Sequence, residues 1–255
     1  MEFVDTHAHI YLADFGSEID EILKTCLDQG VRKILMPNID QSSINDMHLL
    51  EDRFPEHVFS MMGFHPCYVK DDYKEQLKTI EKWFSQRKYR GVGEIGIDMY
   101  WDKSTKEQQI DAFRTQCLWA RSMKLPVSIH SRDALDITIP IIEELQDGNL
   151  SGVFHCFNGT VEDGKRIIDA GFYMGIGGVV TFKKAGVDKT VSQLPYQSMV
   201  LETDAPYLAP TPHRGKQNKP TYIPIIAEKI AEVHEVALSE IAKVTSENAA
   251  KVFGV

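Results

Sequence analysis

The chain has 255 residues, of which 43% are hydrophobic and 25% charged, and its formal net charge is −9 at pH 7. These values are ordinary for a soluble globular protein with a large core. The acidic balance excludes a protein that coats nucleic acid through a general positive field, but it allows an enzyme that takes a phosphate into one local site.

The cysteines and the apolar segments indicate a compartment. Cys26, Cys67, Cys117 and Cys156 show no paired spacing, which predicts free thiols in a reducing environment. The first ten residues lack a basic segment followed by an apolar one, and no apolar run approaches the roughly 20 residues that span a bilayer. We therefore expect a cytoplasmic protein without a membrane segment.

Eight short apolar runs are predicted strands, and segments with helical periodicity lie between them. The runs are residues 2–7, 31–37, 57–64, 91–97, 125–130, 152–157, 171–178 and 198–204. Residues 75–84 and 104–123 are predicted helices, the second beginning with a capping box of Ser104 and Glu107. Its apolar stripe comprises Ile110, Phe113, Cys117 and Ala120.

Strand and helix thus alternate eight times, which predicts an α/β fold of the (β/α)8 TIM-barrel type, with an open doubly wound sheet as the alternative. Residues 205–224 contain five prolines and are predicted to form a long ordered loop after the last strand. Residues 238–255 are predicted to close the fold as one or two helices. We expect a single domain over residues 1–255.

Polar residues of metal-binding type stand at the ends of five predicted strands. In the stretch FVDTHAHI, Asp5, His7 and His9 occupy every second position and share one face of the first strand. The other strands end in Glu94, His130, His155 and Asp204. Each of these residues alone also fits a structural role, such as a hydrogen-bonded core histidine, a paired buried acid or a helix cap. In a barrel, however, the carboxyl ends of all strands ring one mouth, and the joint pattern favours a metal site.

Six donors suit two divalent ions better than one saturated ion. We expect His7 and His9 to hold the first ion, His130 and His155 the second, and Glu94 to bridge both. Asp204 is expected to bind one ion and to take the proton of the attacking water. Imidazole ligands favour Zn²⁺, Mn²⁺ or Fe²⁺. Cys156 adjoins His155, but strand alternation predicts that it faces the other way.

Five segments together resemble one known family. They are DTHAH, GEIGID, SIHSRDA, HCFNG, and ETDAPYLAP followed by RGKQNKP. In this order they resemble the TatD family of metal-dependent deoxyribonucleases, which are barrels of the amidohydrolase-like group. The resemblance implies the same six metal ligands, a substrate-side role near the phosphate for His65, and Mg²⁺ as a further candidate ion. It also implies a nuclease that acts on DNA from the 3′ end, with RNA as an alternative.

Other residues are predicted to support this chemistry. Arg214, Lys216 and Asn218, in the loop over the mouth, could hold phosphate oxygens. Arg132 either contacts substrate or pairs with an acid, Asp133 or Glu143. Asp98 and Glu202 either orient ligand imidazoles or form structural salt bridges. A set of loop aromatics could stack bases, although packing explains most of them: Tyr100, Trp101, Phe157, Phe182 and Tyr207.

The sequence therefore predicts a phosphodiester hydrolase that uses two divalent ions and needs no covalent intermediate. Two alternatives stay open. The same barrel and ligands could hydrolyse an amide, an ester or a small phosphoester. A metal-binding scaffold without catalysis is the second alternative. We expect DNA to be the macromolecular partner, no obligate protein partner, no membrane association and a monomer.

Overall fold

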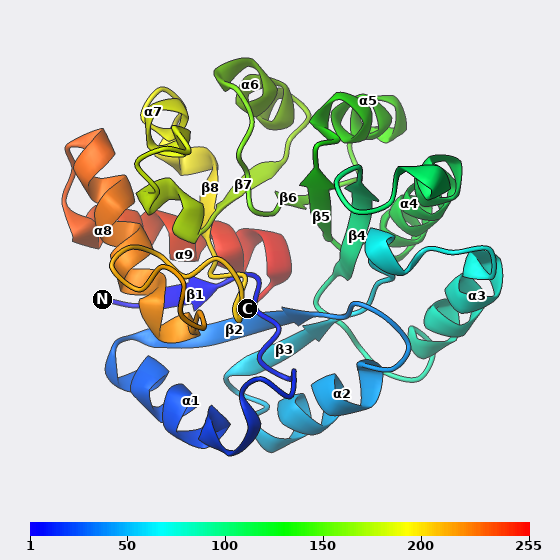
Figure 1. Cartoon of the computed structure of the whole chain (residues 1–255), viewed down its shortest axis with the longest axis horizontal. Helices are drawn as coiled ribbons and strands as arrows, with labels where there is room; N and C mark the ends of the chain where they lie inside the picture. The colour runs from blue at the N-terminus through cyan, green and yellow to red at the C-terminus, as the bar shows by residue number, and fades with distance from the viewer.

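Parallel strands alternate with helices throughout the computed structural model, which describes residues 1–255 (Figure 1). The strands are β1 (Phe3–Asp5), β2 (Val31–Pro37), β3 (Val58–Met61), β4 (Val92–Asp98), β5 (Val127–Arg132), β6 (Gly152–Phe154), β7 (Tyr173–Ile176) and β8 (Met199–Leu201). All eight predicted strands are confirmed.

The helices lie outside the strands (Figure 1). They are α1 (Ile19–Asp28), α2 (Ile44–Arg53), α3 (Tyr73–Trp83), α4 (Lys106–Met123), α5 (Leu135–Leu145), α6 (Val161–Asp169), α7 (Val187–Val191), α8 (Ile223–His234) and α9 (Leu238–Phe253). None of them has the length and apolar character that crossing a membrane requires.

The strands pair in chain order and close on themselves. One ladder joins β1, β2 and β3, and a second joins β4 through β8. Main-chain hydrogen bonds bridge both gaps. Met62 N donates to Gly91 O at 3.1 Å beside β4, and Thr6 N donates to Leu201 O at 2.9 Å between β1 and β8. The predicted (β/α)8 barrel is confirmed, and the open sheet is excluded.

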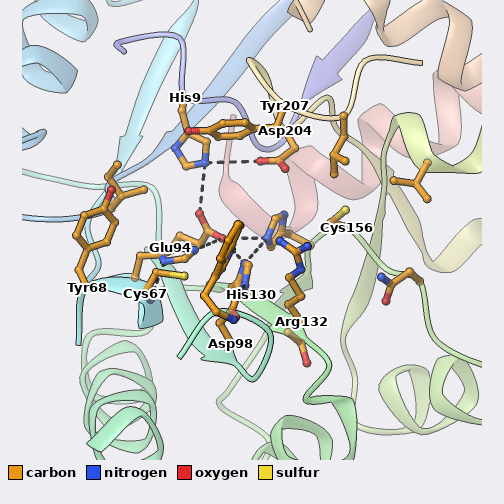
Figure 2. Close-up of a pocket in the computed structure, with 18 of the residues that line it drawn as sticks. His9, Cys67, Tyr68, Glu94, Asp98, His130, Arg132, Cys156, Asp204 and Tyr207 are labelled. Atoms are coloured by element: carbon orange, nitrogen blue, oxygen red, sulfur yellow. Dashed lines mark hydrogen bonds and ion pairs between the residues drawn. The ribbon is translucent and has the colours of Figure 1, made fainter. Parts of the chain in front are cut away.

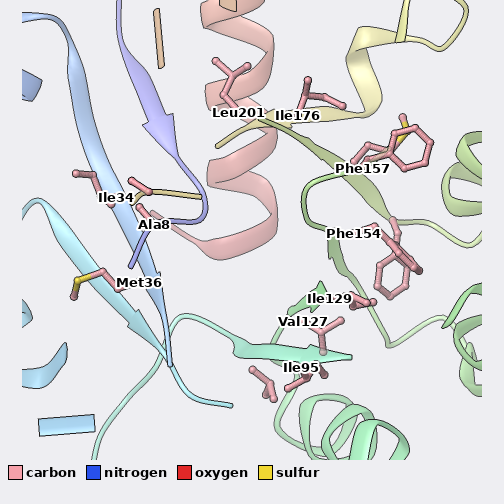
Figure 3. Close-up of a cluster of buried hydrophobic side chains, with 14 of the residues drawn as sticks. Ala8, Ile34, Met36, Ile95, Val127, Ile129, Phe154, Phe157, Ile176 and Leu201 are labelled. Atoms are coloured by element: carbon pink, nitrogen blue, oxygen red, sulfur yellow. The ribbon is translucent and has the colours of Figure 1, made fainter. Parts of the chain in front are cut away.

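Alternation along the strands divides the core into two layers. Ile34 and Met36 of β2, together with apolar residues of the other strands, belong to the large hydrophobic cluster that packs with the surrounding helices (Figure 3). Leu35, between them, belongs to a smaller cluster that includes Phe253 of α9. That cluster comprises Val4, Leu35, Met61, Val153, Val200, Ala249 and Phe253.

Helix α9 covers the amino ends of the strands. Asn248 donates to Met199 O at 2.8 Å where β8 begins, and Ser246 donates to Glu2 O at 3.0 Å just before β1. Its apolar side chains therefore fill one end of the barrel. The carboxyl ends of the strands form the other end, which is where barrel enzymes carry their sites.

Two local predictions are wrong. The capping box of Ser104 and Glu107 does not form, because Asp102 accepts from Ser104 N at 3.0 Å and begins a short 3-10 turn before α4. Strand β1 ends at Asp5, earlier than predicted, so His7 and His9 follow it in extended chain. The proline-rich loop and the closing helix α9 agree with the prediction.

Asp5 joins β1 to the segment that follows β8. Its buried carboxyl group accepts hydrogen bonds from Thr203 N at 3.0 Å and from His7 N at 3.2 Å, and lies 2.5 Å from Thr203 Oγ1.

Asp5→Ala should lower the free energy of unfolding by about 2–4 kcal/mol, because buried N–H groups lose their acceptor and a void is left. Urea denaturation measures this change. Asp71→Ala is the control, since Asp71 is exposed and makes no side-chain hydrogen bond, and its change should stay within about 0.5 kcal/mol. Equal stability of the two variants would contradict this account of Asp5.

Candidate metal centre

The carboxyl ends of the strands surround a cavity of about 710 Å³. Its lining includes His9, Glu94, His130, His155 and Asp204, as Figure 2 shows for most of them. His7 lies beneath this surface, completely buried, with its ring stacked on that of His155 at a centroid distance of 3.9 Å. The structure thus brings all six predicted ligands together.

Glu94, from β4, lies at the centre of the group. Its Oε2 is 3.3 Å from both His7 Nε2 and His9 Nε2. Its Oε1 is 2.8 Å from His130 Nδ1 and 2.9 Å from His155 Nε2. The two oxygens therefore face two separate pairs of imidazoles, which is the arrangement of a carboxylate that bridges two ions.

Asp204 completes the first group. Its Oδ1 lies 3.6 Å from His9 Nε2 and 3.8 Å from His7 Nε2 (Figure 2). The residue follows β8 with a left-handed φ of 58°, a conformation that turns the chain out of the strand. Burial raises the pKa of Asp204 to about 6, although His155 and His9 oppose this shift.

The outer nitrogens of the first two imidazoles are held by hydroxyl groups. Tyr11 donates its hydroxyl hydrogen to Pro37 O at 2.6 Å, so its oxygen must accept from His9 Nδ1 at 3.0 Å. In neutral His9 the lone pair is then on Nε2, which faces Glu94. His7 Nδ1 lies 3.0 Å from Ser128 Oγ, a hydroxyl group that can accept from it or donate to it.

Two buried acids stand behind the other pair. Asp98 Oδ2 is 2.9 Å from His130 Nε2, and Glu202 Oε1 is 3.5 Å from His155 Nδ1. Burial would raise the pKa of Asp98, but its hydrogen bond with His130 and those from the backbone N–H groups of Trp101 and Tyr100 hold this pKa well below its usual range. As an acceptor, Asp98 places the His130 hydrogen on Nε2 and leaves the Nδ1 lone pair toward Glu94. Gly175 makes room for Glu202, since a Cβ there would lie 2.1 Å from Glu202 Oε2. Asp98 therefore has the orienting role toward His130, whereas Glu202 accepts a hydrogen bond from Cys156 N and makes none with His155. Neither acid pairs with a lysine or arginine.

In their neutral forms, His9 and His130 thus turn lone pairs toward Glu94, and this repulsion is relieved by protons or by cations between the groups. The inward nitrogens of His7 and His9 lie 3.3 Å apart, and both face Glu94. Burial would raise the pKa of Glu94, but the surrounding imidazoles of His65, His155 and His7 hold it well below its usual range when they carry a proton toward the carboxylate. Three sets of donors have metal-binding spacing: His7 with His9 and Glu94, His65 with Glu94 and His130, and His7 with His155 and Asp204. The donor set therefore fits divalent ions.

His65, predicted from the resemblance to lie on the substrate side, differs from the ligands. Its Nδ1 accepts from Cys67 N at 3.1 Å, so the neutral ring carries its hydrogen on Nε2, which is 3.2 Å from Glu94 Oε1. Burial lowers the pKa of His65 and favours this neutral form. Its Nε2 has metal-binding spacing with Glu94 and His130, yet the hydrogen makes it a donor.

Arg132 lines the cavity and stacks on Tyr100, with the guanidinium carbon 3.7 Å from the ring centroid. The predicted alternative, pairing with Asp133 or Glu143, is wrong, because no acid lies within 4.0 Å of Arg132 and Glu143 binds Arg166 instead. Arg132 therefore keeps its hydrogen-bond donors available beside the metal centre.

The loop residues predicted to bind phosphate do not line the cavity. Arg214 lies over the ring of Phe182, 4.4 Å from its centroid, and Lys216 is exposed. Their contact with substrate stays a prediction. The prediction that Asn218 binds phosphate is wrong. Asn218 is buried, and its amide donates to Thr203 O and Tyr207 O, both at 2.6 Å. It shapes the loop around Asp204 and has no amide hydrogen left for a phosphate.

The prediction that Cys156 faces away from the site, made from strand alternation, is also wrong. Strand β6 ends at Phe154, and Cys156 has a left-handed φ of 50°, so its side chain lines the cavity. Burial and nearby carboxylates raise the pKa of this thiol well above its usual range. Two supporting residues were missed, although alternation could have found them: Tyr11 continues the series of His7 and His9, and Ser128 precedes His130 by two positions.

Comparison with known proteins agrees with this geometry. Residues 4–254 match the family described as TatD related DNase. The chain belongs to the TatD family. It is 35% identical to the uncharacterized metal-dependent hydrolase YabD of Bacillus subtilis, with 98% of each chain covered. It is 32% identical to the uncharacterized metal-dependent hydrolase YcfH of Escherichia coli, covering 99% of this chain and 96% of YcfH.

The crystal structure of the Escherichia coli TatD homologue YjjV superposes with a TM-score of 0.93 at 26% identity, covering 99% of this chain and 98% of YjjV. The resemblance to the TatD family is therefore confirmed over the whole barrel. The chain is a TatD-type metal-dependent hydrolase.

Asp98→Asn should weaken metal binding by about 10- to 100-fold. The amide oxygen would keep the N–H groups of Tyr100 and Trp101, so its NH₂ would face His130 and move the imidazole hydrogen onto Nδ1, toward Glu94. Competition with a chromophoric zinc chelator measures the affinity. Asp169→Asn, an exposed change on α6, is the control. An affinity for Asp98→Asn equal to that of the control would show that Asp98 does not set the His130 tautomer.

Proposed function

We propose that this TatD-type hydrolase is a deoxyribonuclease that uses two divalent ions and removes nucleotides from the 3′ end of single-stranded DNA, with RNA as an alternative substrate. The observation that carries the proposal is Glu94, whose two oxygens face two separate pairs of imidazoles. His7, His9 and Asp204 would hold one ion, His130 and His155 would hold the other, and Glu94 would bind both. Mg²⁺, Mn²⁺ and Zn²⁺ are the candidates.

Bound ions would supply a water of lowered pKa and stabilise negative charge on phosphate oxygens. The protein must then accept the proton of the attacking water. Asp204 is placed for this role, because its side chain is 13% exposed at the cavity surface whereas that of Glu94 is 3% exposed. A positioned carboxylate that accepts a proton as the new bond forms is a general base.

Donors around the cavity suit a phosphate. Arg132 presents a guanidinium that no acid pairs with, and it can hydrogen-bond phosphate oxygens and offset their charge. His65 lines the same cavity, and its Nε2 hydrogen would have to turn from Glu94 to reach a phosphate. These groups favour a phosphodiester over an amide or carboxylic ester, whose neutral carbonyl gains less from a free guanidinium.

Two loops that each add a residue to the cavity lining, Val179 and Leu208, carry four exposed basic residues: Lys183, Lys184, Arg214 and Lys216. The loops are joined by the hydrogen bond from Thr211 N to Thr181 Oγ1 at 2.9 Å. In a chain with a net charge of −9, basic residues on the loops that contribute to the cavity support a substrate with more than one phosphate.

Asp204→Asn should lower the rate of DNA shortening by about 100- to 10,000-fold, the usual contribution of a general base. The protein is stripped of metal, supplied with Mg²⁺, Mn²⁺ or Zn²⁺ in turn, and mixed with single-stranded DNA labelled at its 3′ or 5′ end. Early release of a 3′ label, with a ladder of shortened products from the 5′-labelled strand, is expected. Asp28→Asn, exposed on α1, should cleave like wild type.

Other results would replace the proposal. A folded protein that binds two ions but cleaves no nucleic acid would be assigned to amide, ester or small phosphoester hydrolysis. Tight DNA binding without cleavage under any metal would favour the scaffold.

A further inference from the structure

An exposed aromatic pair stands at the mouth of the cavity, directly after β4. The side chain of Trp101 is 69% exposed and that of Tyr100 is 52% exposed. Their rings meet edge to face, with centroids 5.0 Å apart and an interplanar angle of 89°. Trp101 is the most exposed of the large hydrophobic side chains, so its ring is accessible to a ligand. Trp101 also lines the cavity.

Arg132 of β5 stacks against this pair. Its guanidinium carbon lies 3.7 Å from the centroid of Tyr100 and 5.5 Å from that of Trp101. The close stacking covers one face of Tyr100, so Trp101 offers the less covered ring. A guanidinium that stacks through its flat face still has its edge N–H groups free for phosphate oxygens.

The pair is fixed to the metal centre through one carboxylate. Asp98 Oδ1 accepts from Tyr100 N and Trp101 N, both at 2.9 Å, while its Oδ2 is bonded to the ligand His130. A group held on Trp101 is therefore kept at a defined position relative to the centre.

We propose that Trp101, with Tyr100 and Arg132 behind it, is a base-stacking subsite that holds the nucleobase adjoining the bond to be cleaved. Arg132 binds that nucleotide's phosphate. The subsite rests on the proposed nuclease function and gives a physical reason for its single-stranded substrate, because the faces of a base inside a duplex are covered by its neighbours. Stacking on one aromatic side chain typically favours a base by roughly 5- to 150-fold, and it tolerates any sequence.

Binding tests the subsite without turnover. Metal-stripped protein is titrated with a short thymidine oligonucleotide and with a backbone of equal length in which tetrahydrofuran replaces every nucleoside. The chain has three tryptophans, and the other two, Trp83 and Trp119, lie half-buried on α3 and α4. The thymidine oligonucleotide should quench the tryptophan fluorescence in a saturable manner, and the abasic backbone should not. Trp101→Phe should abolish the quenching, and Trp119→Phe should keep it. Quenching that persists in Trp101→Phe, or that the abasic backbone equals, would overturn the subsite.

Cleavage gives a second, separable readout. The ratio of kcat/KM for a normal 3′ end to that for a tetrahydrofuran 3′ end should be about 10 in wild type, fall toward one in Trp101→Ala and recover in part in Trp101→Phe. Cleavage with an unchanged ratio in Trp101→Ala would remove the subsite and leave the nuclease. A wild-type protein that cleaves neither substrate would remove the nuclease, and the fluorescence titration would then decide the subsite alone.

Discussion

One buried negative charge organises the site. Glu94 is almost fully buried, and the imidazole nitrogens of His7, His9, His65, His130 and His155 all lie within 3.3 Å of its oxygens. A carboxylate removed from water is unstable unless opposite charge or donors surround it. His65 alone is fixed as a hydrogen-bond donor by a backbone N–H. Bound cations would complete this compensation, and the outer partners of His9 and His130 keep the lone pairs of the neutral rings turned toward them.

The barrel makes this convergence possible by dividing its two ends. Helix α9 fills the amino end with apolar side chains, so stability there does not depend on the site. At the carboxyl end, short strands release the chain early, and left-handed residues such as Cys156 and Asp204 turn side chains inward. Asp98 contacts both His130 of the metal centre and the backbone of Trp101, so one carboxylate positions a predicted ligand and the proposed stacking residue. Strained conformations at such positions are typical of functional sites.

Much of this could be predicted from the sequence. Apolar periodicity located all eight strands, and barrel topology placed residues from β4 and β5 beside those following β1, β6 and β8. The predictions failed where the direction of a side chain depends on the conformation of a loop. Cys156 and the capping box of Ser104 depended on local backbone turns that no periodicity encodes. Asn218 looked like a phosphate ligand, but only the folded loop shows that its amide is used by Thr203 O and Tyr207 O.

The most direct test of the account is a crystal structure of the protein with Zn²⁺ or Mn²⁺, with the ions located by anomalous scattering. The account predicts two ions. One should lie among His7, His9 and Asp204, the other between His130 and His155, with one Glu94 oxygen on each. A single ion bound by both Glu94 oxygens, or ions that leave Glu94 free, would contradict the central claim.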